Sequence, residues 1–273
     1  MNNLIKTAVI GAVSLGGLYV LSTQGRTGHP GLKQLQGWKY AHRGLHDETK
    51  PENSMAAFRA ALEAGYGIEL DIHLLKDGNL AVMHDSSLLR TAGCDINMEE
   101  LTTDQLKDYP LGGTDQTIPE FREVLELFAG KAPIIIELKV AKGNYAALTE
   151  TACAMMEGYN GPWCMESFDP RCIWWLKKHR PDIIRGQLTA NYFKDEKSTL
   201  SVPLKWGLQN QVFNFVTRPD FTAYKFEDRK TLSNSLVRKF WGVQGVSWTI
   251  RSQADFDTAV KEGWIPIFEN FNP

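Results

Sequence analysis

Cysteine is scarce in this chain of 273 residues, which contains four cysteines and no CxxC pair. This spacing argues against a thioredoxin-type redox motif and against the usual cysteine zinc sites. Four cysteines in so long a chain also do not make a disulfide framework, so we expect buried free thiols. The sequence also lacks a P-loop and a GxSxG pattern, which argues against those phosphate-binding and nucleophile motifs.

Excess charge of either sign is absent as well. Lys and Arg number 30 and Asp and Glu number 32, for a formal net charge of -2, and no basic run stands out. We therefore expect no nucleic-acid partner. The hydrophobic content of 43% is that of an ordinary globular protein, and the length fits one barrel of ~250 residues.

One long uncharged run is present, at residues 7–25 between Lys6 and Arg26. Its roughly 19 residues approach the ~20 that an α-helix needs to cross a bilayer. An uncleaved membrane anchor is our first interpretation, and a cleaved signal peptide is the alternative. We expect an anchor or signal segment at 1–26, a linker at 27–37 and a folded domain at 38–273. The protein would then be membrane-associated through a single N-terminal pass, on a side that the flanking charges do not decide.

Short apolar runs alternate with helix-like segments along the rest of the chain. The expected strands occupy residues 39–44, 67–75, 80–85, 132–140, 163–169, 182–189, 212–216, 245–250 and 264–270. The expected helices occupy residues 54–65, 117–130, 144–158, 170–181 and 252–263. We expect long loops at residues 191–205 and 217–235.

This alternation is typical of parallel β/α units whose strands are covered on both faces. At this length an α/β fold of the TIM (β/α)8 barrel type is the simplest closure. An open doubly wound sheet is the alternative, although the first turn, HRGLHD, is not a GxGxxG pattern.

Charged side chains collect at the ends of the expected strands. Glu69 and Asp71 lie two residues apart in one strand, and Glu137 and Lys139 repeat this spacing in another. Residues two apart on a strand point to the same face. Three carboxylates on the floor of a barrel would repel one another, and a divalent cation relieves that repulsion. Oxygen ligands without cysteine favour Mg²⁺ or Ca²⁺.

Basic and imidazole groups lie at the same strand ends. Arg43 and Lys139 add positive charge suited to a phosphate group. His42 and His84 can serve as acid and base, because imidazole titrates near neutral pH. Trp248, at another strand end, either walls the substrate pocket or fills the barrel. Each residue alone also fits a structural ion pair or a surface turn, and only the conjunction indicates a phosphate-handling site.

The pattern AHRG, PENS, ELD, KDG, HD and ELK, over residues 39–140, resembles the glycerophosphodiester phosphodiesterase family, as a membrane-anchored bacterial-type member. The resemblance implies a TIM barrel that binds one divalent cation, Mg²⁺ or Ca²⁺, at Glu69, Asp71 and Glu137. It implies that His42 and His84 are the acid–base pair. It also implies that Arg43 and Lys139 contact the phosphate of a small-molecule substrate. The family cleaves glycerophosphodiesters to glycerol 3-phosphate and an alcohol.

Two other functions stay open at this point. A lysophospholipase D would use a lipid that keeps its acyl chain, and an apolar groove at residues 205–216 would favour it. A catalytically silent barrel could serve as a membrane-tethered binding module. The last strand ends in FENFNP and not in the TDRP-like turn common in the family. The resemblance therefore does not identify the residues on that rim of the pocket.

Overall fold

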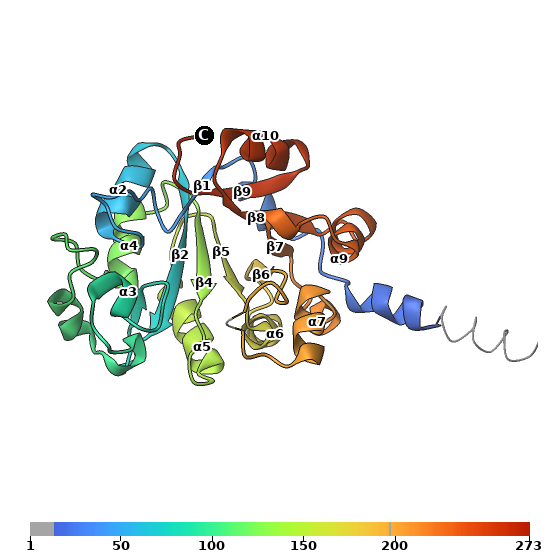
Figure 1. Ribbon diagram of the computed structural model, residues 1–273, viewed down its shortest axis with the longest axis horizontal. Coiled ribbons are helices and arrows are strands. Elements are labelled where there is room, and N and C mark those ends of the chain that lie inside the picture. The colour runs from blue at the N-terminus through green and yellow to red at the C-terminus, as the bar shows by residue number, and fades with distance from the viewer. Residues whose placement is uncertain (1–13, 197) are drawn as a thin grey trace, which may run out of the picture.

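A computed structural model describes residues 14–196 and 198–273 (Figure 1). The described strands form one sheet in the order β1-β9-β8-β7-β6-β5-β4-β2-β3, and an additional β1–β2 pairing closes it. Every pairing is parallel except that of β3, which lies antiparallel on β2. The strands are β1 (Tyr40–His42), β2 (Gly67–Leu74), β3 (Leu80–Val82), β4 (Ile134–Leu138), β5 (Trp163–Ser167), β6 (Arg185–Thr189), β7 (Phe221–Lys225), β8 (Gln244–Ile250) and β9 (Trp264–Phe268). The eight strands that remain without β3 make the expected TIM-type barrel.

Helices surround this barrel (Figure 1). From β1 onward the described α-helices are α2 (Met55–Glu63), α3 (Leu89–Ala92), α4 (Phe121–Phe128), α5 (Tyr145–Met155), α6 (Pro170–His179), α7 (Val202–Gln209), α8 (Asn214–Thr217), α9 (Leu232–Asn234) and α10 (Gln253–Lys261). The 3₁₀ segments are η1 (Pro30–Gln34), η2 (Met98–Glu100), η3 (Thr103–Asp108) and η4 (Phe226–Asp228), and η5 (Ser235–Phe240) is a π-helix.

The barrel interior is apolar at the end where the strands begin. Leu35 and Tyr40 lie in one buried cluster with residues of β4 to β9, and Leu35 is 2% exposed. The Tyr40 hydroxyl donates to the Leu35 carbonyl oxygen at 2.8 Å. This filling confines any polar cavity to the other end, where the strands finish. The expectation of buried free thiols is confirmed for Cys153, Cys164 and Cys172, whereas Cys94 is free but only partly buried.

Three of the expected assignments differ from the structure. Residues 212–216 are not a strand, because Arg218 N–H donates to the Asn214 carbonyl at 2.7 Å and the segment is helical as α8. The seventh barrel strand is β7, inside the expected loop at 217–235, where Thr222 pairs with Gln187 of β6 and Gly245 of β8. The expected loop at residues 191–205 contains the start of α7.

The N-terminal part of the chain contacts the barrel helices. Residues 14–22 are helical and extend away from the barrel beside α7 and α9 (Figure 1). Tyr19 and Trp206 have ring centroids 6.2 Å apart, and Trp241 Nε1 donates to the Val20 carbonyl at 3.0 Å. Within the described residues no helix has the length and apolar character to cross a membrane. Residues 1–13 of the expected anchor lie outside the described residues, so the anchor stays a prediction.

Candidate active site

Three buried carboxylates meet where the strands finish. Glu69 and Asp71 come from β2, and Glu137 comes from β4 beside Asp71 in the sheet register. One ligand oxygen from each lies within 4.8 Å of the others. The two-residue spacing in β2 therefore brings both acids to the inner face, as predicted.

The donor set fits a hard divalent cation. It consists of oxygen atoms alone, and Asp71 Oδ1 is buried with no hydrogen-bond partner in the described part of the chain. Burial and the neighbouring carboxylates raise the pKa of Glu69 well above its usual range. Burial, opposed by Lys139, also raises the pKa of Glu137 to about 7. Such mutual repulsion is what a bound Mg²⁺ or Ca²⁺ relieves.

Arg43 and Lys139 lie against this carboxylate group. Lys139 Nζ donates to Glu137 Oε1 at 2.9 Å and lies 3.4 Å from Asp71 Oδ1. Arg43 Nη1 donates to Glu52 Oε1 at 2.9 Å, and its Nε lies 3.5 Å from Asp71 Oδ2. Although burial opposes its ionisation, the Lys139 ammonium, His84 and Arg43 hold the pKa of Asp71 below its usual range.

The HRG and PENS motifs adopt backbone conformations that few residues favour. Arg43 and Asn53 have positive φ angles of 56° and 55°. Strain of this kind collects at functional sites. Asn53 Nδ2 donates to Asp71 Oδ2 at 2.9 Å, while Ser54 caps α2 by accepting from Ala57 N–H at 3.2 Å. Gly44 has φ +81°, and a Cβ there would lie 2.9 Å from Ala57.

His42 and His84 both line the cavity above the carboxylates. His42 Nδ1 lies 3.1 Å from Glu269 Oε1, and its Nε2 lies 3.9 Å from Glu69 Oε2. His84 Nδ1 lies 2.6 Å from Asp85 Oδ1. Burial lowers the pKa of His42 and lowers that of His84 to about 4. In each histidine the Nδ1 contact leaves Nε2 for a reacting group.

An ion-pair chain runs from Asp85 back to Arg43. Arg90 Nε donates to Asp85 Oδ2 at 2.6 Å, and its Nη2 donates to Glu52 Oε1 at 2.6 Å. Glu52 in turn accepts from Arg43. The segment that carries His84 and the loop that carries Arg43 are therefore tied together across the mouth of the barrel.

The cavity has a volume of about 260 Å³. Six predicted site residues line it: His42, Arg43, Glu69, His84, Glu137 and Trp248. Asp71 and Lys139 are the two predicted residues outside the lining. Asp71 contacts the lining residue Arg43, and Lys139 contacts the lining residue Glu137. Trp248 packs edge-on against Phe168, with ring centroids 5.6 Å apart. Trp248 lines the cavity and also packs against the buried cluster inside the barrel, so both interpretations of this residue stay predictions.

Two acids of this site were not predicted from the sequence. Glu166 in β5 lies beside Glu137 in the register and is 1% exposed. Glu269 follows β9 and contacts His42 and His46. Each comes in or directly after an apolar strand run, the same signal that identified Glu69 and Glu137.

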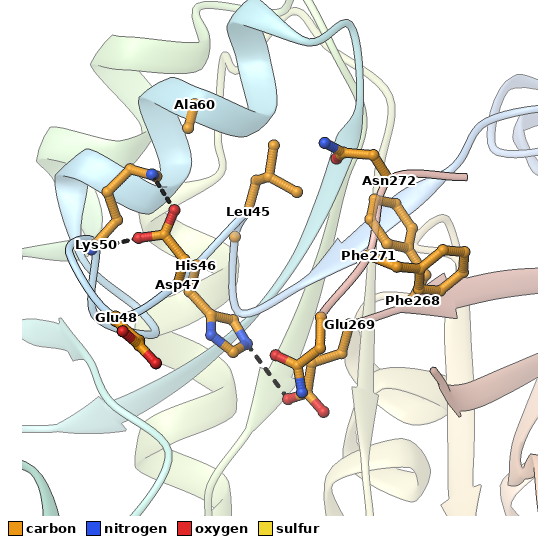
Figure 2. Close-up of a pocket in the computed structure, with 12 residues that line it drawn as sticks. Leu45, His46, Asp47, Glu48, Lys50, Ala60, Phe268, Glu269, Phe271 and Asn272 are labelled. Carbon is orange, nitrogen blue, oxygen red and sulfur yellow. Dashed lines mark hydrogen bonds and ion pairs between the residues drawn. The ribbon is translucent and has the colours of Figure 1, made fainter. Parts of the chain in front are cut away.

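A second hollow of about 660 Å³ adjoins the cavity at Glu269 (Figure 2). Leu45, Phe268 and Phe271 give it an apolar side, and Asp47 and Lys50 give it a polar side. Glu269 lines both hollows. Residues 205–216, where an apolar groove would favour a lysophospholipase D, lie in and between α7 and α8.

The chain is similar in sequence to known phosphodiesterases. A family model described as the glycerophosphoryl diester phosphodiesterase family matches residues 42–272. A glycerophosphodiester phosphodiesterase of Bacillus altitudinis is 40% identical over 114 residues, 39% of this chain and 46% of the relative. The human lysophospholipase D GDPD1 is 35% identical over 134 residues, 44% of this chain and 41% of the relative. The chain thus spans about half the length of these curated relatives.

Solved structures share the fold. An Oleispira antarctica phosphodiesterase, solved in complex with the product sn-glycerol-3-phosphate, superposes with a TM-score of 0.71 at 19% identity, covering 89% of this chain and 95% of the other. The glycerophosphodiester phosphodiesterase of Thermotoga maritima superposes with a TM-score of 0.65 at 23% identity, covering 85% and 93%. At these low sequence identities the structural similarity shows the barrel fold alone.

Proposed function

The chain belongs to the glycerophosphoryl diester phosphodiesterase family, and we propose that it is a metal-dependent enzyme that hydrolyses glycerophosphodiesters to glycerol 3-phosphate and an alcohol. The observation that carries the proposal is the group of Glu69, Asp71 and Glu137, whose ligand oxygens lie within 4.8 Å of one another beside two histidines. The cavity of about 260 Å³ suits a small polar substrate.

Glu69, Asp71 and Glu137 would hold one Mg²⁺ or Ca²⁺, which supplies Lewis-acid polarisation of a phosphoryl oxygen. Arg43 and Lys139 would place donors on the remaining phosphate oxygens and stabilise their charge as the phosphorus is attacked. The side chains of Arg43 and Lys139 already contact carboxylates, so an incoming phosphate would share these two cationic groups with the carboxylates. The ion pairs hold the two side chains in place before substrate arrives.

His42 and His84 would carry the protons. One imidazole takes the proton of the glycerol 2-hydroxyl while that oxygen attacks phosphorus, and the other protonates the leaving alcohol. This route yields a cyclic phosphate that water then opens, and direct attack by water is the alternative. Phosphorus NMR under single turnover distinguishes the two, because only the first route passes through a cyclic phosphate.

The test is an assay of the full chain with glycerophosphocholine and Mg²⁺ or Ca²⁺, in which choline and glycerol 3-phosphate are both measured. The proposal expects equal amounts of the two products. Release of glycerol and phosphocholine in place of choline and glycerol 3-phosphate would assign cleavage to the other P–O bond. No release by folded, metal-loaded protein would favour the catalytically silent barrel.

A lysophospholipase D is the second candidate. The observation in its favour is the hollow of Figure 2, whose apolar side at Leu45, Phe268 and Phe271 adjoins the cavity and could receive an acyl chain. A preference for lysophosphatidylcholine over glycerophosphocholine in the same assay would support this candidate.

We also propose that the enzyme is membrane-associated through its N-terminal segment. Leu15, Leu18 and Leu21 of the helical residues 14–22 are 70%, 63% and 54% exposed, which is unusual for leucine and leaves this helix an apolar surface. Recovery of the full chain in the membrane fraction of an expressing cell supports the proposal. Recovery in the soluble fraction, with the N-terminus intact by mass spectrometry, contradicts it.

A further inference from the structure

Glu166 is a buried acid whose carboxylate is unused within the described residues. It lies on β5, next to Glu137 in the sheet register, and it lines the cavity above the proposed metal site. Its Oε2 has no hydrogen-bond partner, and no ion pair of the described residues involves its side chain. Burying a carboxylate in this way is costly unless a ligand satisfies it.

The carboxylate is not a member of the metal-ligand group. Among the described residues the group of three or more acids, histidines or cysteines placed to hold a metal ion consists of Glu69, Asp71 and Glu137 and does not include Glu166. Adjacent parallel strands lie ~4.8 Å apart. A substrate atom next to one held at Glu137 is therefore within reach of Glu166.

Trp248 supplies a complementary group in the same cavity. Its Nε1 is buried and donates to no partner among the residues that the structure describes, although the ring lines the cavity. One buried acceptor and one buried donor, both unsatisfied, match a hydroxyl group, which donates one hydrogen bond and accepts others. Neither a hydrocarbon nor an ester oxygen satisfies both.

We propose that Glu166, with Trp248, binds the free primary hydroxyl of the substrate's glycerol group and so selects deacylated glycerophosphodiesters over lysophospholipids. The inference rests on the proposed function and narrows its substrate class. When the 2-hydroxyl lies at the metal-ligand group, the hydroxyl on the neighbouring carbon reaches the next strand, which is β5. In a 1-acyl lysophospholipid that hydroxyl is esterified, which leaves the Glu166 carboxylate desolvated and unpaired. Sites built to bind a hydroxyl reject analogues that lack it.

The test compares glycerophosphocholine with the phosphocholine ester of propane-1,2-diol, which differs only in lacking the primary hydroxyl. For the wild-type full chain with Mg²⁺ or Ca²⁺ we expect kcat/KM to favour glycerophosphocholine by on the order of 10- to 100-fold, as for a buried polar group left without its hydrogen bond. Glu166→Ala should lose most of this preference by slowing glycerophosphocholine cleavage alone. Trp248→Phe, which keeps the ring and deletes the N–H donor, should lose part of it.

Binding provides a readout that does not depend on turnover. Calorimetry with glycerol 3-phosphate and with its 1-deoxy analogue should show the same preference in the wild type and its loss in Glu166→Ala. Metal affinity should stay within about threefold of the wild type, because Glu166 lies outside the ligand group. Glu63→Gln, an exposed acid at the end of α2, is the control and should match the wild type throughout.

Three outcomes would overturn the inference. Equal cleavage of both esters by the wild type would show that the protein does not bind the primary hydroxyl, and it would leave the proposed function intact. Equal losses on both esters in Glu166→Ala, with weakened metal binding, assign Glu166 to the metal site. Cleavage of neither ester by the wild type defeats the proposed function itself, and the inference with it.

Discussion

His42 and Glu269 face each other across the seam where β1 pairs with β9, with 3.1 Å between His42 Nδ1 and Glu269 Oε1. The same Glu269 oxygen lies 3.3 Å from His46 Nε2, a contact marked by a dashed line in Figure 2, and Oε2 accepts from Arg251 Nε at 2.7 Å. Although Glu269 is partly buried, its hydrogen bonds from His42 and His46 lower its pKa, so it remains ionised. It is thus placed to hold the proton of His42 on Nδ1 and to orient the ring.

Glu269→Gln is therefore expected to lower kcat by roughly 10- to 100-fold with a smaller effect on KM, because it perturbs an acid–base group and not substrate contacts. The carboxylate raises the pKa of His42 against the effect of burial. Its removal should lower that pKa further and move to lower pH the limb of the kcat/KM profile that reports His42. An unchanged profile with full activity would mean that Glu269 is structural.

His42→Ala and His84→Ala are each expected to lower kcat by roughly 10²- to 10⁴-fold, the usual contribution of one acid or base. Both side chains line the cavity, so neither loss should arise from a change in the core. Steady-state kinetics with metal in excess, together with circular dichroism to verify folding, check this. A variant that keeps more than half of the activity removes that histidine from the mechanism.

The stability of the metal-free protein should fall as pH rises from 6.5 to 8. Glu137 has a pKa of about 7 when folded, against 4.5 as its ordinary value. In this window the folded state therefore binds more protons than the unfolded state, so stability decreases with pH. Burial also raises the pKa of Glu69 and Glu166, which adds to the effect. His84, with a folded pKa of about 4, acts in the opposite sense but below this window.

Thermal unfolding after chelation checks this expectation. Glu137→Gln should flatten the dependence of Tm on pH. Added Mg²⁺ or Ca²⁺ should raise Tm more at pH 8 than at pH 6.5, because the cation and the protons compete for the same carboxylates. A Tm that rises with pH in metal-free protein would contradict the assigned pKa directions.

The part of the site on β2 and β4 was predictable because charged residues lie two apart in apolar strands. This spacing placed Glu69 and Asp71 on one face of their strand and Glu137 on the same face as Lys139, and the fold brings the three acids together. Glu166 also lies in an apolar run, WCMESFD. It was not predicted, because no second charged residue lies two positions away on its short strand to indicate which face it occupies.

The later half of the barrel was harder to predict for a different reason. The run VFNFV is apolar enough for a strand, but helical hydrogen bonds such as Thr217 N–H to the Phe213 carbonyl, at 3.0 Å, decide its conformation. The true strand β7, FTAYK, is short and carries polar residues. Its identity comes from its pairing with β6 and β8, and pairing over such distances in sequence is not visible locally. The position of Glu269 opposite His42 depends on the same long-range closure.

Leu35→Ala tests the apolar filling of the barrel. Leu35 is 2% exposed and packs in the cluster that contains Tyr40. We expect a loss of about 2–4 kcal/mol in the free energy of unfolding, the range for truncating a buried leucine. Urea denaturation measures it, with Leu89→Ala as the control, because Leu89 is 59% exposed. A loss in Leu35→Ala no larger than in the control would show that residue 35 does not belong to the core.

Release of glycerol 3-phosphate from glycerophosphocholine measures the proposed metal-dependent phosphodiesterase activity itself. The full chain is measured after chelation and again after Mg²⁺ or Ca²⁺ is restored. We expect no release without the cation, release with it, and a loss of that release in Glu69→Gln. Full activity in excess EDTA, with no metal retained by elemental analysis, would contradict the claim.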